Sequence, residues 1–98
     1  MIQELKRLDL QLKKDQEIIQ DIFVCDFLKQ DFNLYDTKQI EILTALIRYY
    51  ATMKEINKTL LNNTNDLEGF KFHTNQLNLN DQVHKKLISI KLFLICNK

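Results

Sequence analysis

The stretch DTKQIEILTALIRYYATMKEINKTLLN, residues 36–62, decides the fold. Its apolar residues recur at alternating spacings of four and three, which keeps one face of a helix apolar along its whole length. This stripe consists of Ile42, Leu46, Tyr49, Met53, Ile56 and Leu60. A second apolar stripe covers a neighbouring face in the first half only: Ile40, Leu43, Ile47 and Tyr50. A helix that is apolar on two faces needs neighbours on more than one side.

We therefore expect residues 36–62 to form the central helix of a small all-α domain. Part of its apolar face is a candidate for contact with another copy of the chain. The residues assigned to packing, either in the core or between subunits, are Tyr49, Met53, Ile56 and Leu60. Asp36 is a suitable N-cap, and Gln39 three residues later completes a capping-box pattern. The asparagine-rich stretch after residue 61 competes with the helical backbone and predicts the end of the helix.

The segment before the central helix also has a helical pattern, from about Ile2 to Asp31. Its apolar seam has one polar break, at Asp15, and residues 1–15 are a candidate for a semi-independent helical arm. The seam consists of Leu5, Leu8, Leu12, Ile19 and Ile22. The spacing resembles a short two-faced seam and not a long coiled coil.

The segment of residues 67–80 gives the weakest helical signal. Gly69 is the only glycine of the chain, and Phe70 to Thr74 alternates between apolar and polar residues as a short strand does. We predict an ordered loop or a small hairpin here, followed by a last helix from about Asp81 to Cys96. That helix is apolar on most sides, so we expect it to be buried or to pack against a partner. The whole chain is thus predicted to be one domain, residues 1–98, with three main helices.

Composition limits the class of protein without identifying it. The chain has 98 residues, a net charge of +1 and no proline, which suits one soluble helical domain that is not globally basic. Cys25 and Cys96 lie among apolar residues, so we expect buried free thiols in a reducing cytoplasm. The apolar tail is too short to span a bilayer and contains Lys91, and we expect no membrane contact. Abundant lysine, asparagine and isoleucine follow AT-rich codons and suggest an AT-rich bacterium or its virus.

The residue types that usually carry chemistry are not arranged for it in this sequence. His73 and His84 have no partner at metal-ligand spacing. No histidine is placed beside Cys25 or Cys96, and a single glycine cannot build a phosphate-binding loop. We therefore expect no catalytic activity, no metal and no cofactor.

Several basic residues are candidates for contacts with DNA phosphates. Lys85 and Lys86 fall in the first turns of the predicted last helix, where positive charge opposes the helix dipole. Lys54 and Lys58 are like charges one turn apart, which costs a little stability, and Arg48 is expected near them. The alternative interpretation for each group is an ordinary solvated surface.

The order of these parts resembles the shorter type of phage small terminase subunit. The pattern consists of residues 21–28, an acidic cap at Asp36, a long helix with the run Leu43 to Tyr50, a polar loop with Gly69 and a final apolar helix. Unlike many members, this chain has no Asn-Pro pair before the last helix and stops where a longer tail would begin. The resemblance implies a homo-oligomer that binds viral DNA and recruits a large subunit with ATPase and nuclease activity.

A second hypothesis belongs to another class of protein. The alternative to this leading hypothesis is a compact protein-binding inhibitor, such as an anti-defence or antitoxin-like module. It would bind a host protein through an apolar helix face or through residues 67–80. The near-neutral charge favours this hypothesis over DNA binding.

Overall fold

The structure is a computed structural model that describes residues 2–20, 24–32 and 36–96. The described residues form four helices and no strand. The helices are α1 (Ile2–Ile19), α2 (Val24–Phe27), α3 (Thr37–Asn62) and α4 (Leu67–Cys96). Three of them are long, so the prediction of an all-α domain with three main helices is confirmed.

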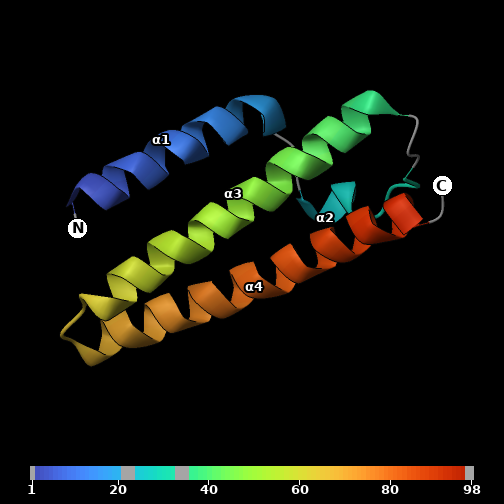
Figure 1. Ribbon diagram of the computed structural model, residues 1–98. Helices are drawn as coiled ribbons and strands as arrows, with labels where there is room; N and C mark the ends of the chain where they lie inside the picture. Colours follow the sequence, from blue (N-terminus) through green and yellow to red (C-terminus); the bar gives the residue numbers. More distant parts are fainter. Residues whose placement is uncertain (1, 21–23, 33–35, 97–98) are drawn as a thin grey trace.

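The three long helices form one flat layer with α3 in the middle. Figure 1 shows α1 along one side of α3 and α4 along the other, while short α2 lies at one end only. No Cα atom of α1 comes within 8 Å of one in α4 among the described residues, because α3 separates them. The molecule measures 47 × 23 × 23 Å and is therefore elongated along these helices.

The central helix begins and ends where the sequence predicts. Asp36 has an extended backbone, and its side-chain oxygen accepts a hydrogen bond of 3.1 Å from the backbone N–H of Gln39. This satisfies one of the free N–H groups at the helix start. At the other end, the N–H of Asn63 bonds to the carbonyl of Leu60 at 3.2 Å, which closes the last turn.

The apolar core lies at the end of the layer where α2 is found. Its buried members come from all four helices: Ile19, Phe27, Leu43, Ala45, Leu46, Leu87 and Leu94. Phe27 is the buried residue of α2, and its ring meets that of Phe32 edge-on at 5.2 Å. The four-residue α2 thus gives this half of the flat layer a partial second layer.

The prediction of a loop or hairpin over residues 67–80 is wrong. A loop does precede the last helix, but it covers only residues 63–66, and α4 is helical from Leu67. Asp66 caps the helix by accepting a hydrogen bond from the N–H of Gly69. A Cβ atom on Gly69 would lie 2.6 Å from Oγ1 of Thr64, so the glycine permits this tight start and does not break the helix. Packing along α3 outweighs the weak helical preference of the segment.

Two further expectations about the chain need correction. The first predicted segment does not run as one helix to Asp31, because α1 ends at Ile19 and Gln20 has a positive φ of 55°. Ile22 of the predicted seam and residues 21–23 of the terminase-like pattern lie outside the described residues. Cys25 and Cys96 are free but exposed, not buried. Cys25 is exposed because Phe27, and not Cys25, is the residue of α2 that is buried in the core. Cys96 is the last residue of α4.

Candidate functional site

The predicted basic residues meet acidic side chains in the structure. Nζ of Lys54 lies 2.9 Å from one carboxylate oxygen of Asp81, and Nζ of Lys85 lies 3.0 Å from the other. Lys54 is largely buried, with 19% of its side chain exposed, whereas Lys85 is 76% exposed. The hydrogen bonds from Lys54 and then from Lys85 lower the pKa of Asp81 to about 2. Lys54 therefore links α3 to α4 through this carboxylate, whereas Lys85 pairs with it within α4.

His84 joins this cluster as a neutral side chain. Its Nδ1 atom lies 3.2 Å from Nζ of Lys54. Because an ammonium group can only donate, Nδ1 must accept, which assigns the ring proton to Nε2. Partial burial, and then the positive charge of Lys54, lower the pKa of His84, and the nearby Asp81 opposes this shift. The geometry thus keeps His84 uncharged near neutral pH.

We expect the free energy of unfolding to fall as the pH is lowered through the ordinary histidine range. The pKa of His84 is lower in the folded protein than its usual 6.5. The unfolded chain therefore binds the proton first, and stability is lost below that value. Urea unfolding at about pH 7.5 and about pH 5.5 measures this change, and His84→Gln should reduce the pH dependence. Asp81 stays ionised over the whole range and does not contribute. An identical pH dependence in wild type and variant would contradict the assignment.

The remaining candidates for DNA contact do not form one basic surface. Nε of Arg48 lies 3.0 Å from a carboxylate oxygen of Asp15, on the side of α3 that faces α1. Nζ of Lys58 lies 3.7 Å from Glu55. Lys86 is exposed, and it has no ion pair among the residues that the structure describes. The role of these five residues in binding phosphate stays a prediction, and four of them are already engaged with carboxylates.

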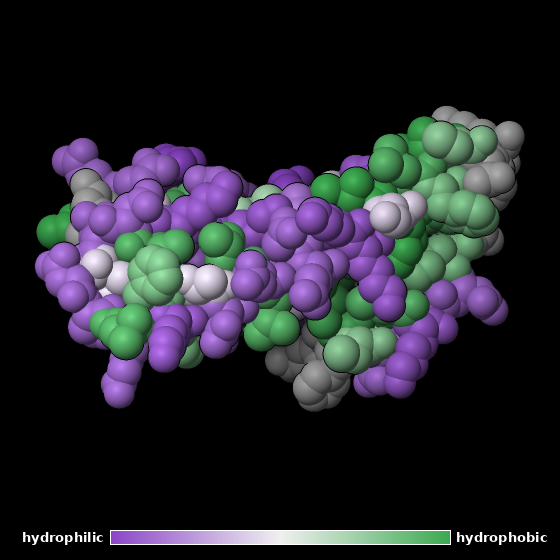
Figure 2. All heavy atoms as spheres, turned by 90° about the horizontal axis from the view of Figure 1, so that it is seen from below, coloured by the Kyte–Doolittle hydropathy of each residue, from purple (hydrophilic) through white to green (hydrophobic). Residues whose placement is uncertain are grey.

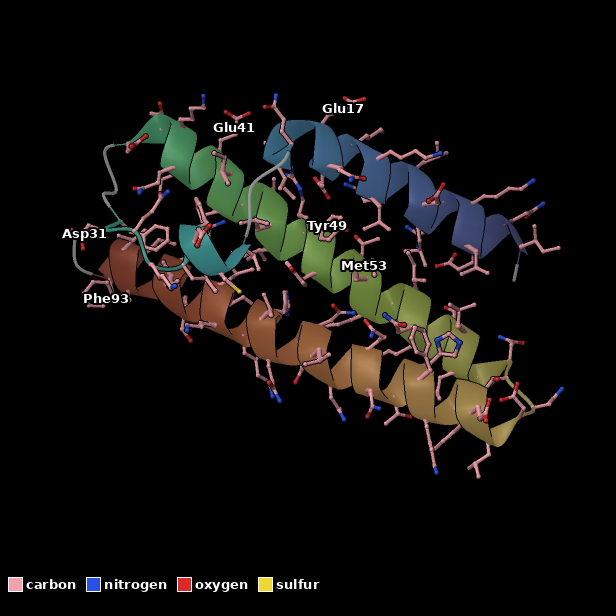
Figure 3. All side chains as sticks on the ribbon, turned by 180° about the vertical axis from the view of Figure 1, so that it is seen from behind. Glu17, Asp31, Glu41, Tyr49, Met53 and Phe93 are labelled. Carbon is pink, nitrogen blue, oxygen red and sulfur yellow. The ribbon has the colours of Figure 1, made fainter. Side chains whose placement is uncertain are left out.

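The apolar stripe assigned to packing is only half-buried beyond the end of α2. Tyr49, Met53, Ile56 and Leu60 each keep part of their surface exposed. Tyr49 packs against the core and lines a hollow of about 260 Å³ that also touches Val24 of α2. Figure 3 shows Tyr49 and Met53 farther along α3 than α2 reaches. The short α2 therefore covers the start of the full apolar stripe, at Ile42 and Leu46, and leaves the part beyond Tyr49 less completely covered.

Large apolar side chains gather at the C-terminal end of α4. Leu92, Phe93 and Ile95 are 56%, 66% and 49% exposed, and we call these three residues the α4 patch. Figure 2 shows hydrophobic residues concentrated at this end of the molecule, whereas the opposite end is mostly hydrophilic. Phe93 also lines a hollow of about 400 Å³, together with Phe32 and Ile90. Exposed groups of this kind are typical of interaction surfaces.

The sequence contained the signal for the α4 patch, although no site was predicted there. Residues 87–96 are apolar on most sides, which favours either burial or a partner. In the structure α4 has only α3 beside it in the layer, so the outward apolar residues remain exposed.

The fold and this surface define a small all-helical protein with an apolar patch on its outer helix. No family model matches the chain, and neither a curated protein nor a solved structure matches it. Among the described helices, none combines the length and apolarity needed to cross a membrane. Nor do three or more His, Cys, Asp or Glu side chains of the described residues come together as metal ligands would.

Proposed function

We propose that this protein acts by binding another protein through the α4 patch, without catalysing a reaction. The exposure of Leu92, Phe93 and Ile95 is the observation that carries the proposal. These three large apolar side chains lie within about one turn of α4, and they lose their remaining water-exposed surface only when something covers them. Full burial of an exposed side chain of this size is worth about 1.5–3 kcal/mol, and each of these keeps about half or more of its surface to bury. The hollow beside Phe93 offers room for one further side chain of the partner. This corresponds to the inhibitor hypothesis, with the C-terminal end of α4 as the binding surface.

Site-specific photo-cross-linking in the natural host tests the proposal. A photoreactive phenylalanine analogue replaces Leu92 in one preparation and Leu10 of α1, which is 61% exposed, in the other. We expect one stoichiometric protein adduct from position 92 and none from position 10. Introducing Ile95→Glu into the first preparation should lower the adduct yield at least tenfold, because a charge in an apolar contact is poorly tolerated.

The matched control carries Ile2→Glu in place of Ile95→Glu, since Ile2 is also an exposed isoleucine, at 67%. This change should leave the adduct yield unaltered. Equal adducts from positions 92 and 10, or none from position 92, would contradict the proposal.

DNA binding by an oligomer, as in small terminase subunits, is the second candidate. Lys85 and Lys86 are both exposed and adjacent on α4, which favours it. A protein with this function would be encoded by a phage or mobile element, and it would recruit a large packaging subunit. Duplex DNA binding that weakens with salt, and loses part of its salt dependence in a Lys85→Glu and Lys86→Glu double variant, would support it. Absence of DNA binding at low salt would contradict this second candidate function.

A further inference from the structure

The hollow beside Phe93 has two walls that come from different parts of the chain. One wall is α4, which contributes Ile90, Phe93 and Leu94, and the other is the stretch of residues 30–32. Asp31 is the one charged residue that lines the hollow, and the others are apolar or uncharged. Figure 3 shows Asp31 and Phe93 at the same end of the molecule. The hollow therefore combines an apolar lining with a single negative charge.

The wall formed by residues 30–32 is held in place by α3 and by the core. Nε2 of Gln39 donates to Oε1 of Gln30 at 3.3 Å and to the backbone carbonyl of Asp31 at 3.0 Å. The ring of Phe32 packs edge-on against the buried ring of Phe27. These contacts use the backbone of Asp31 and not its carboxylate. A site that is shaped in advance loses less free energy when a partner binds.

The carboxylate of Asp31 has no counter-charge in the described part of the chain. Asp31 is exposed, and neither Lys29 nor Lys86, one turn before the hollow on α4, forms an ion pair with it. Lys91 lies against α3 instead, where its Nζ atom donates to Oγ1 of Thr44 at 3.5 Å. Five acidic residues elsewhere are paired with lysine or arginine: Glu4, Asp9, Asp15, Glu55 and Asp81.

We propose that this hollow binds an arginine side chain of the protein that covers the α4 patch. The inference rests on the proposed function, because it gives the chemistry of the partner at the same surface. A partner that covers Phe93 also removes water from Asp31, since both residues line one hollow. A carboxylate that loses its water without gaining a counter-charge is costly. An entirely apolar partner is therefore disfavoured, and a partner with a cation beside its apolar residues is favoured.

Arginine matches both parts of the hollow. Its methylene stem can lie along Phe32 and Ile90, because long cationic side chains bury their stems against apolar surface. Its planar guanidinium group can pair with both carboxylate oxygens of Asp31, and it is more weakly hydrated than an ammonium group. Oγ of Ser89 donates to the carbonyl of Lys85 at 3.0 Å, and its lone pairs remain free to accept a further guanidinium N–H.

A titration of the whole ¹⁵N-labelled protein, followed by NMR, tests the inference. The probes are two capped tripeptides with leucine at both ends and either arginine or citrulline, its uncharged isostere, in the middle. We expect the arginine peptide to shift the amide signals of residues 30–32 and 89–94. It should bind about fivefold more tightly than the citrulline peptide, which is the upper range for an ion pair that water still reaches.

Asp31→Asn should abolish this preference for the arginine peptide. The matched control is Glu41→Gln, which also removes one negative charge, from an exposed residue of α3 on the side away from α4 (Figure 3). Equal affinities of wild type for the two peptides overturn the inference, as does binding of neither peptide at millimolar concentrations. A preference that survives Asp31→Asn, or that Glu41→Gln abolishes as well, also overturns it.

Cross-linking from position 92 separates this inference from the proposed function. We expect Asp31→Asn to lower the adduct yield about fivefold or more and Glu41→Gln to leave it unaltered. An adduct that Asp31→Asn does not weaken overturns the inference but leaves the proposed function intact. Absence of the adduct in wild type contradicts the proposed function, and the inference with it. Circular dichroism verifies that both variants remain helical.

Discussion

Replacing Arg48 with methionine is expected to destabilise the protein by about 3 kcal/mol. The side chain of Asp15 is 1% exposed, and its two oxygens accept hydrogen bonds from Nε of Arg48 at 3.0 Å and from Nε2 of Gln11 at 3.1 Å. Without Arg48 a buried carboxylate would lose its counter-charge, which is costly. Arg48 itself is 50% exposed, so water can replace part of the interaction. Urea unfolding at neutral pH measures the change in the free energy of unfolding.

An exposed arginine provides the matched control for this prediction. Arg7 pairs with Glu4 on the surface of α1, with both side chains about half exposed or more. We expect Arg7→Met to cost less than about 0.5 kcal/mol, because exposed ion pairs contribute little. Adding Asp15→Leu to Arg48→Met should restore much of the stability by removing the buried charge. Equal losses from Arg48→Met and Arg7→Met would contradict the structural role of the Arg48–Asp15 pair.

Leu87→Ala is expected to cost about 3 kcal/mol, within the usual range for a buried leucine. Leu87 is 0% exposed and belongs to the same core cluster as Leu43 and Leu94. Removing its side chain leaves a cavity in the contact between α3 and α4, at the end where most apolar burial is found. Thermal or urea unfolding of the purified variant measures the loss.

The control for this change is another leucine of the same helix. Leu92 is 56% exposed, and Leu92→Ala should change the free energy of unfolding by less than about 0.5 kcal/mol. Similar losses for the two variants would mean that Leu87 does not lie in the core.

The central helix could be predicted from the sequence because its signals are local and agree with one another. A cap at Asp36, an uninterrupted apolar stripe and an asparagine-rich end together define Thr37–Asn62. The first turns of α4 could not be predicted in the same way. Asn75, Asn78 and Asn80 are poor helix formers, and Phe70 and Phe72 alternate as in a strand. That segment becomes helical because it packs along α3 over its length, and packing of this kind has no local signature.

The basic residues show why spacing alone does not predict a site. Arg48 and Asp15 are 33 positions apart, and only the fold brings them together. The sequence did mark Asp15, as the one polar residue in the apolar seam of the first helix, but not its partner. Lys54 and Lys85 likewise lie on different helices and converge on Asp81. Of the basic candidates, Lys86 is the one whose surroundings in the described structure leave its charge unpaired.

The placement of the core at one end of an elongated layer also has consequences for motion. Local unfolding requires less free energy where few apolar contacts must be broken. The end of the layer that joins α3 to α4 should therefore open and close many times before the end held by Phe27 and Leu87 does. One half of each long helix is thus expected to form a rigid base that carries the α4 patch, while the other half opens before the whole molecule unfolds.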